Sequence, residues 1–123
     1  SGPGQFNIPV GVMLSNGRLV VVDSYNHRIQ VFTTDGAFIT MFGRKGESDG
    51  QFNYPSYIAE DKEGNFLVTD HSNHRVQVFT SDTFSHVACF GSKSCLPNSE
   101  GIAVSPSGTV YVSNHRKPSI TRF

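Results

Sequence analysis

The chain has 123 residues, which is enough for one domain with its own hydrophobic core. Its 10 Lys and Arg balance its 10 Asp and Glu, so net charge does not favour binding to DNA or to a membrane surface. No apolar run approaches the roughly 18 residues that a membrane-spanning helix requires.

From the N-terminus onward, the sequence predicts short strands separated by turns. β-Branched and apolar residues alternate or run together over strand lengths, and no segment shows a helical period. Ser15-Asn16-Gly17 and Thr34-Asp35-Gly36 are typical of tight hairpins. The predicted strands cover residues 10–14, 18–23, 28–33, 37–42, 57–61, 65–70, 75–80, 84–90, 101–105, 108–114 and a final run ending at Phe123.

A repeat of about 47 residues runs through these strands. The segment Gly50-Gln-Phe-Asn-Tyr-Pro55 repeats Gly4-Gln-Phe-Asn-Ile-Pro9, and the third copy is degenerate, with Pro118-Ser119 in its His-Arg position. Four antiparallel strands per repeat are the unit of a β-propeller. We therefore predict an all-β fold of about 2.75 blades, a partial propeller over residues 1–123 with repeats at about 4–49, 50–97 and 98–123.

The repeated residues resemble a known family. Phe-x-x-Pro, followed by Gly64-Asn-Phe-Leu-Val-Thr-Asp70, Asn73-His-Arg-Val-Gln-Val-Phe79 and Phe90-Gly91, is similar to the NHL repeat, and the second copy is closest to animal TRIM-NHL proteins. The resemblance implies a propeller, typically six-bladed, that binds RNA stem-loops or protein partners. It also implies that any RING ubiquitin-ligase chemistry lies outside this chain.

Eleven predicted strands do not close a propeller ring. An open stack of blades leaves sheet faces unburied, so this chain is interpreted as a fragment of a longer chain or as one part of an assembly. Two copies would supply close to the number of strands in a six-bladed ring. A homo-oligomer that completes the ring is therefore one expected partner.

One end of the predicted blades is richer in basic residues than the other. We call this end the loop face; it consists of loops 23–28, 70–75 and 114–119 and connectors 43–55 and 91–100. It carries seven Lys or Arg against five Asp or Glu, together with four of the five histidines, whereas the opposite loops carry two against four. Basic groups position phosphates, and Tyr or His stacks on unpaired bases.

The resemblance to TRIM-NHL proteins, with some support from this charge pattern, implies a cytoplasmic, non-catalytic binding module that recognises an RNA stem-loop in translational regulation. The alternative is a scaffold that binds a protein partner without RNA contact. Asp23/Arg28 and Asp70/Arg75 recur at the same spacing, so the aspartates are interpreted as structural, and the arginines as equally compatible with structure or binding. The predicted RNA- or partner-binding residues are Tyr25, His27, Arg28, Arg44, Lys45, His71, His74, Arg75, His115, Arg116 and Lys117.

No cofactor and no metal site is predicted, because no catalytic arrangement or metal-ligand spacing is visible. His27 and His74 occupy equivalent repeat positions and could converge on zinc, but they belong to the ordinary repeat pattern. His86 stands alone in a strand and is interpreted as a surface residue or a satisfied residue rather than as a metal ligand. Cys89 and Cys95 are interpreted as free thiols in a reducing compartment, with a local disulfide as the alternative. The recurring Phe6, Phe32, Phe42, Phe52, Phe79 and Phe90 are predicted to pack in the core.

Overall fold

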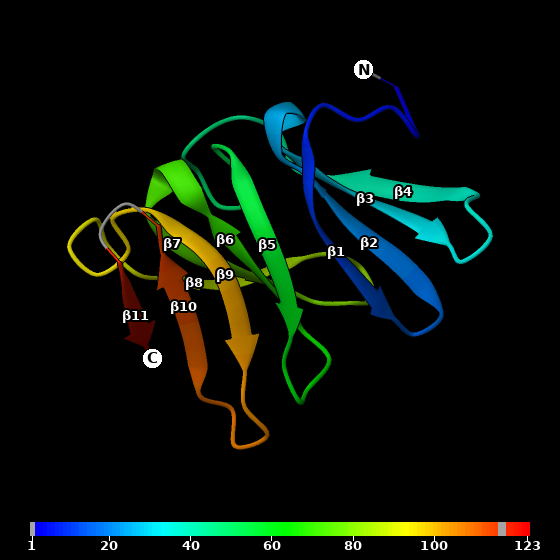
Figure 1. The fold of residues 1–123 in the computed structure, drawn as a ribbon. Helices are drawn as coiled ribbons and strands as arrows, with labels where there is room; N and C mark the ends of the chain where they lie inside the picture. The colour runs from blue at the N-terminus through cyan, green and yellow to red at the C-terminus, as the bar shows by residue number, and fades with distance from the viewer. Residues whose placement is uncertain (1, 116–117) are drawn as a thin grey trace.

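The computed structural model describes residues 2–115 and 118–123, and it confirms the all-β prediction. Its strands form three antiparallel sheets, which we call blades 1, 2 and 3 (Figure 1). Blade 1 contains β1 (Pro9–Ser15), β2 (Arg18–Asp23), β3 (Arg28–Thr33) and β4 (Phe38–Phe42). Blade 2 contains β5 (Pro55–Glu60), β6 (Phe66–Asp70), β7 (Arg75–Phe79) and β8 (His86–Phe90). Blade 3 contains β9 (Ser99–Val104), β10 (Val110–Asn114) and β11 (Ser119–Arg122).

Within each blade, consecutive strands pair as hairpins, so sequence order is also spatial order. The first strands of the blades, β1, β5 and β9, run side by side across the three sheets (Figure 1). Two single-turn 3₁₀ helices, η1 (Ser24–Asn26) and η2 (His71–Asn73), follow the second strands of blades 1 and 2. One turn is too short to show a helical period in the sequence. No described helix is long or apolar enough to cross a membrane.

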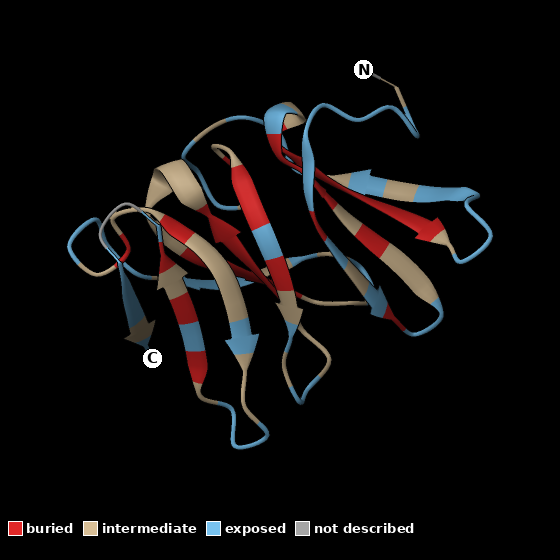
Figure 2. Ribbon diagram, viewed as in Figure 1, coloured by how far each residue is buried: buried red, intermediate tan, exposed pale blue. Residues whose placement is uncertain are grey.

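The hydrophobic core lies between blades, because each sheet packs against the next one. We call the side of a blade that points to the following blade its forward face and the other side its back face. Side chains alternate between the two faces along each strand. Figure 2 shows that burial concentrates on the middle strands. The forward face of blade 1 (Val20, Val22, Ile29, Val31) meets the back face of blade 2 (Phe52, Ile58, Phe66, Val68, Phe79), and a second cluster joins blade 2 (Leu67, Val76, Val78) to blade 3 (Leu96, Val110, Val112).

The connectors between blades pass very close to the core. A side chain at Gly43 would place its Cβ 2.5 Å from the Phe52 ring, and one at Gly91 would lie 2.5 Å from Leu96. Both glycines also have a positive φ that other residues rarely adopt. Leu96 therefore takes the place of Phe52 in blade 3, although no phenylalanine marks that position in the sequence.

The core prediction is correct for most of the recurring phenylalanines and wrong for Phe6. Phe52, Phe32 and Phe79 are buried, and Phe42 and Phe90 pack against the two clusters. Phe6 is 41% exposed, because it lies on the back face of blade 1, and no blade of this chain covers that face. Repetition therefore identified a position that is buried in blade 2 and that the described blades leave exposed in blade 1.

Candidate functional site

Each of the first two blades places a buried ionic network beneath the loop face. In blade 1 the Arg28 Nε donates to Asp23 Oδ2 at 2.9 Å, and the Gln30 amide donates to the same oxygen at 3.2 Å. Nη2 of Arg28 donates to the carbonyl oxygens of Gly2 and Gln5 at 3.1 and 2.9 Å, and Nη1 lies 3.3 Å from the Met41 sulfur. This network ties the segment before β1 to the middle strands of the blade.

Blade 2 repeats the same network on its own connector. Asp70 accepts from Arg75 Nε at 2.9 Å and from the Gln77 amide at 3.1 Å. Arg75 also donates to the carbonyl oxygens of Glu47 (2.9 Å), Ser48 (3.0 Å) and Gln51 (2.9 Å). The structure thus confirms that the aspartates accept from the arginines, and it shows that the arginines hold the connector.

Blade 3 keeps the geometry of this network without its charges. Asn114 pairs with Ser119 in the register that joins Asp23 to Arg28 in blade 1. The Asn114 amide donates to the hydroxyls of Ser119 and Thr121 at 3.1 and 3.0 Å. Thr121 in turn donates to the Cys95 carbonyl, as Gln30 does to that of Gln5. The acid and the base are lost together, which leaves no uncompensated buried charge.

The environment of Asp23 favours its ionised form. Burial would by itself raise the pKa of this carboxyl group. The backbone N–H of Asn7 and the side chains of Asn26, Arg28 and Gln30 all donate to it, and together they lower its pKa below the usual value. Hydrogen bonds to the carboxylate therefore outweigh desolvation at this position.

The two repeated histidines use the same ring nitrogen in opposite ways. His27 and His74 both adopt the left-handed backbone conformation that ends a 3₁₀ turn. The Tyr54 backbone N–H donates to Nδ1 of His27 at 3.0 Å, whereas Nδ1 of His74 lies 2.8 Å from the Leu96 carbonyl oxygen and so must donate. Burial and the nearby charge of Lys45 lower the pKa of His27, although Asp70 acts in the opposite sense. His27 is therefore held in its neutral form.

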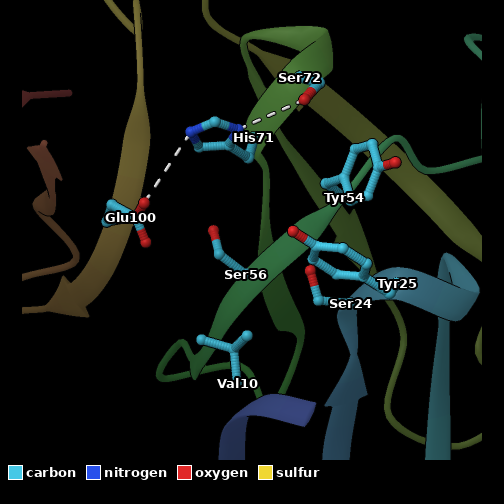
Figure 3. A pocket seen from close by; sticks show the side chains of 8 residues that line it. All are labelled: Val10, Ser24, Tyr25, Tyr54, Ser56, His71, Ser72 and Glu100. Carbon is cyan, nitrogen blue, oxygen red and sulfur yellow. Dashed lines mark hydrogen bonds and ion pairs between the residues drawn. The ribbon is translucent and has the colours of Figure 1, made fainter. Parts of the chain in front are cut away.

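A pocket of about 320 Å³ opens on the loop face where the three blades meet (Figure 3). The rings of Tyr25 and Tyr54 lie edge to face, with centroids 4.9 Å apart, on one side of it. His71 approaches Glu100 at 3.9 Å across the opposite side. Ser56 lies between these two pairs (Figure 3). The pocket is lined by Val10, Ser24, Tyr25, Tyr54, Ser56, His71, Ser72 and Glu100.

The structure places the predicted site residues in two groups. Tyr25 and His71 line the pocket, and Arg44, Lys45 and His115 are exposed elsewhere on the loop face. In contrast, His27 and Arg28 are buried, and His74 and Arg75 are half-buried and bonded within the fold. The predictions for Arg116 and Lys117 fall outside the described residues.

The burial of these ion pairs changes the predicted charge of the loop face. Arg28 and Arg75 neutralise Asp23 and Asp70, and none of these four groups is freely exposed. Among the described residues of the loop face, three basic groups then remain, and their charge is balanced by three acidic groups. The basic groups are Arg44, Lys45 and Lys93, and the acidic groups are Glu47, Asp49 and Glu100.

Sequence reasoning did not identify the serines or Glu100 as pocket residues. Ser24 and Ser56 are buried in different blades, and Glu100 comes from β9 in the third. Single serines and one carboxylate carry no motif, so only the stacking of three blades brings them together. Tyr54, which was also left out of the predicted site, does depart from the repeat, since it replaces Ile8 of the first copy.

The sequence also matches known proteins. The model of the NHL repeat matches residues 6–32 and 52–79. The chain is 42% identical over 57 residues to Protein brain tumor of Drosophila melanogaster, covering 46% of this chain. It is 41% identical over 60 residues to RING finger protein nhl-1 of Caenorhabditis elegans, covering 48% of this chain. The aligned part spans only 6% of each of these relatives.

Solved structures share the fold at much lower identity. Glutaminyl cyclase of Myxococcus xanthus superimposes with a TM-score of 0.72 at 19% identity, over 96% of this chain and 55% of that one. Virginiamycin B lyase of Staphylococcus aureus gives a TM-score of 0.68 at 13% identity, over 94% and 40%. Likenesses this distant establish a common fold and nothing of the activity.

These structures correct one expectation. We expected a chain without a catalytic role, and that conclusion was wrong, because enzymes are among the proteins that share this architecture. The relatives of higher identity carry NHL repeats, and the described strands follow the repeat pattern in all three blades. The chain thus contains NHL repeats at residues 6–32 and 52–79, folded as β-propeller blades, and it is related to the TRIM-NHL proteins.

Proposed function

We propose that this chain recognises unpaired bases of an RNA stem-loop at the loop face, as part of post-transcriptional regulation in the cytoplasm. The observation that carries the proposal is the pocket between the three blades, with Tyr25 at its rim. Tyr25 is 48% exposed although its neighbours on the same turn are buried or half-buried. An exposed aromatic ring held on a rigid turn is suited to stacking on a base that has left its helix.

The pocket offers hydrogen-bonding groups for a base edge. Glu100 accepts hydrogen bonds and would pair with an exocyclic amino group, as acidic side chains do with cytosine. The hydroxyls of Ser24, Ser56 and Ser72 can donate or accept. Such a pocket would distinguish bases by their edges, while Tyr25 would stack on any of them.

Beside the pocket, Arg44 and Lys45 would contact the phosphate backbone. Both side chains are exposed, and Lys45 lies close enough to His27 to lower its pKa. The His27 ring contacts the Tyr54 ring at 4.6 Å, which connects this basic pair to the pocket. Two phosphate contacts give a weak salt dependence, with a slope of log K against log salt of about −1.4 for single-stranded RNA.

The test is the affinity of the chain for a stem-loop RNA with an unpaired loop. Replacing Tyr25 with Ala should weaken binding by about 1–3 kcal/mol, the usual contribution of one stacked base, while Tyr25→Phe should retain binding. Tyr111→Ala is the matched control, because Tyr111 is similarly exposed (40%) on the forward face of blade 3, away from the pocket. Equal losses for Tyr25→Ala and Tyr111→Ala would contradict the proposal.

A second candidate is a protein partner that inserts a basic side chain into the same pocket. Glu100 favours it, since a pocket with a carboxylate on one side and two tyrosine rings on the other also suits a Lys or Arg side chain. The variant Glu100→Gln separates the two functions. It removes the charge that attracts a cation and keeps an acceptor for a base amino group. Loss of binding to a basic peptide, with unchanged RNA affinity, would favour the protein partner.

A further inference from the structure

Strand β8, the outer strand of blade 2, presents two metal-binding side chains on one face. His86 and Cys89 are three residues apart, so regular alternation would point them to opposite sides of the sheet. The pairing of β7 with β8 contains a bulge: Phe79 faces His86 and Val78 faces Ala88, which leaves Val87 as an extra residue. A bulge of this kind re-aims a side chain, and here it brings His86 and Cys89 to the same face.

The connector between blades 1 and 2 places a carboxylate over this pair. Arg75 donates to the carbonyl oxygens on the N-terminal side of Asp49, at Glu47 and Ser48. On its C-terminal side the Gly50 N–H donates to the Gln77 side chain at 3.0 Å. Asp49 is therefore carried on backbone that blade 2 fixes from both sides.

The three side chains form one cluster. Their ligand atoms all lie within 4.8 Å of one another, and Nδ1 of His86 is 3.9 Å from a carboxylate oxygen of Asp49. Ligands of a tetrahedral zinc ion are separated by about 3.3–3.8 Å when their bonds to the metal are 2.0–2.3 Å long. Asp49 and Cys89 are exposed, whereas His86 is half-buried, so the carboxylate and the thiol are the ligands that can adjust toward the imidazole. In addition, Nε2 of His86 is buried without a hydrogen-bond partner among the described residues.

The fold does not require these residues, as blade 1 demonstrates. Blade 1 has the same bulge, with Phe32 facing Phe38 and Gln30 facing Met41. Phe38 and Met41 hold the positions of His86 and Cys89, and Pro3, which precedes Gly4, holds that of Asp49. Three positions that are apolar in blade 1 have thus become a carboxylate, an imidazole and a thiol in blade 2.

We propose that Asp49, His86 and Cys89 bind a divalent transition-metal ion of the Zn²⁺ class. One thiolate, one imidazole and one carboxylate form a mixed donor set that suits Zn²⁺ and Co²⁺ and is unsuited to Mg²⁺ or Ca²⁺. Three protein ligands leave a fourth position for water or for an atom of a partner. The Cys89 thiol gives up its proton on binding, so the affinity rises with pH. This proposal does not depend on the function of the loop face.

The experiment is a titration of the reduced full chain with Co²⁺ and with Zn²⁺. Co²⁺ should produce a thiolate-to-metal charge-transfer band, which Zn²⁺ should remove by displacement. Cys89→Ser should abolish the band, and Asp49→Asn should weaken metal binding by at least about tenfold. The matched control is Cys95→Ser, which replaces the other free cysteine, whose sulfur accepts a hydrogen bond from the Ser92 backbone N–H. This variant should leave the band unchanged.

A second variant separates loss of metal binding from misfolding, because blade 1 shows which apolar residues fit at these positions. The double substitution His86→Phe with Cys89→Met copies the apolar pair of blade 1 and should leave circular dichroism and thermal unfolding intact while binding of both metals is lost. Metal binding that survives in this double variant would overturn the proposal. So would a charge-transfer band that Cys95→Ser removes as completely as Cys89→Ser does.

Discussion

At the scale of single residues, the repeat preserves a buried charge only together with its partner. Asp23 and Arg28 are both buried in blade 1, and blade 3 has replaced both by the neutral Asn114 and Ser119. Removing one member of a buried ion pair leaves an uncompensated charge, whereas removing both can be nearly neutral. The third repeat therefore shows that the fold is compatible with a neutral pair at these two positions.

This pairing leads to a prediction about stability. Asp23→Asn should lower the free energy of unfolding by about 3–5 kcal/mol, because Arg28 stays buried without its carboxylate. Adding Arg28→Ser, which reproduces the pair found in blade 3, should recover part of that loss. Urea unfolding of the two single variants and the double variant measures the coupling. Losses that simply add would show that the two side chains stabilise the fold independently.

A second prediction concerns the neutral state of His27. Its pKa in the folded chain is lower than in the unfolded chain, so the unfolded state binds more protons as pH falls. The stability that depends on neutral His27 is therefore fully present above the unfolded pKa of about 6.5, and it is lost as pH falls through the folded pKa. Between about pH 7.5 and pH 5.5, the unfolding free energy should decrease more for the native chain than for His27→Asn.

The choice of Asn in that variant rests on the backbone. His27 has a φ of 53°, and Asn tolerates the left-handed region better than most residues. Nuclear magnetic resonance can check the same point directly, since the ring should carry its proton on Nε2 while Nδ1 accepts from Tyr54. A His27 pKa at or above its ordinary value would contradict the prediction.

At the scale of elements, the strands were predictable and the connectors were not. Residues 18–23 and 28–33 were predicted with the bounds that β2 and β3 have, and the other strands differ by a few residues at their ends. Alternating patterns and turn residues are local signals, so they can be read from the sequence. Leu96 could not be predicted as the counterpart of Phe52, because its burial depends on a connector (residues 91–98) that is four residues shorter than the connector that carries Phe52 (residues 43–54).

The same distinction applies to the candidate sites. Tyr25 and His71 were identified because they depart from the repeat, and departures from a repeat are free to serve recognition. Arg28 and Arg75 were equally visible in the sequence, yet in the structure they form ion pairs with Asp23 and Asp70 within the blades. The bulge in β8 has no sequence signature, so the cluster of Asp49, His86 and Cys89 could be recognised only after the strands were paired.

A third prediction tests the close packing of the first connector. Gly43→Ala should destabilise the chain, since its Cβ would lie 2.5 Å from the rigid ring of Phe52. Gly36 is the matched control, because its φ of 94° is close to the 97° of Gly43 while nothing lies within 4 Å of an added Cβ. Overpacking typically costs about 1–3 kcal/mol, so Gly43→Ala should lose that much more than Gly36→Ala in thermal or urea unfolding.

At the scale of the whole molecule, the two outer blade faces expose apolar residues. The back face of blade 1 presents the same strand positions that blade 2 buries against its neighbour, and its Val12 and Leu14 are each 66% exposed. The forward face of blade 3 is similarly uncovered, with Ile120 at 67%. Apolar surface of this extent favours association, and each face has the geometry of a surface that packs against another blade.

The last prediction follows from these faces: copies of this chain should associate head to tail, with the forward face of blade 3 against the back face of blade 1. Two copies related by a two-fold axis would bury both pairs of faces and close a ring. Sedimentation velocity over a dilution series should then show a dimer. Val12→Lys should shift it toward monomer, because the lysine would be buried at the contact. The control Val87→Lys alters a comparably exposed valine (53%) on the outer strand β8 and should leave the dimer intact. A folded monomer at every concentration would contradict this prediction.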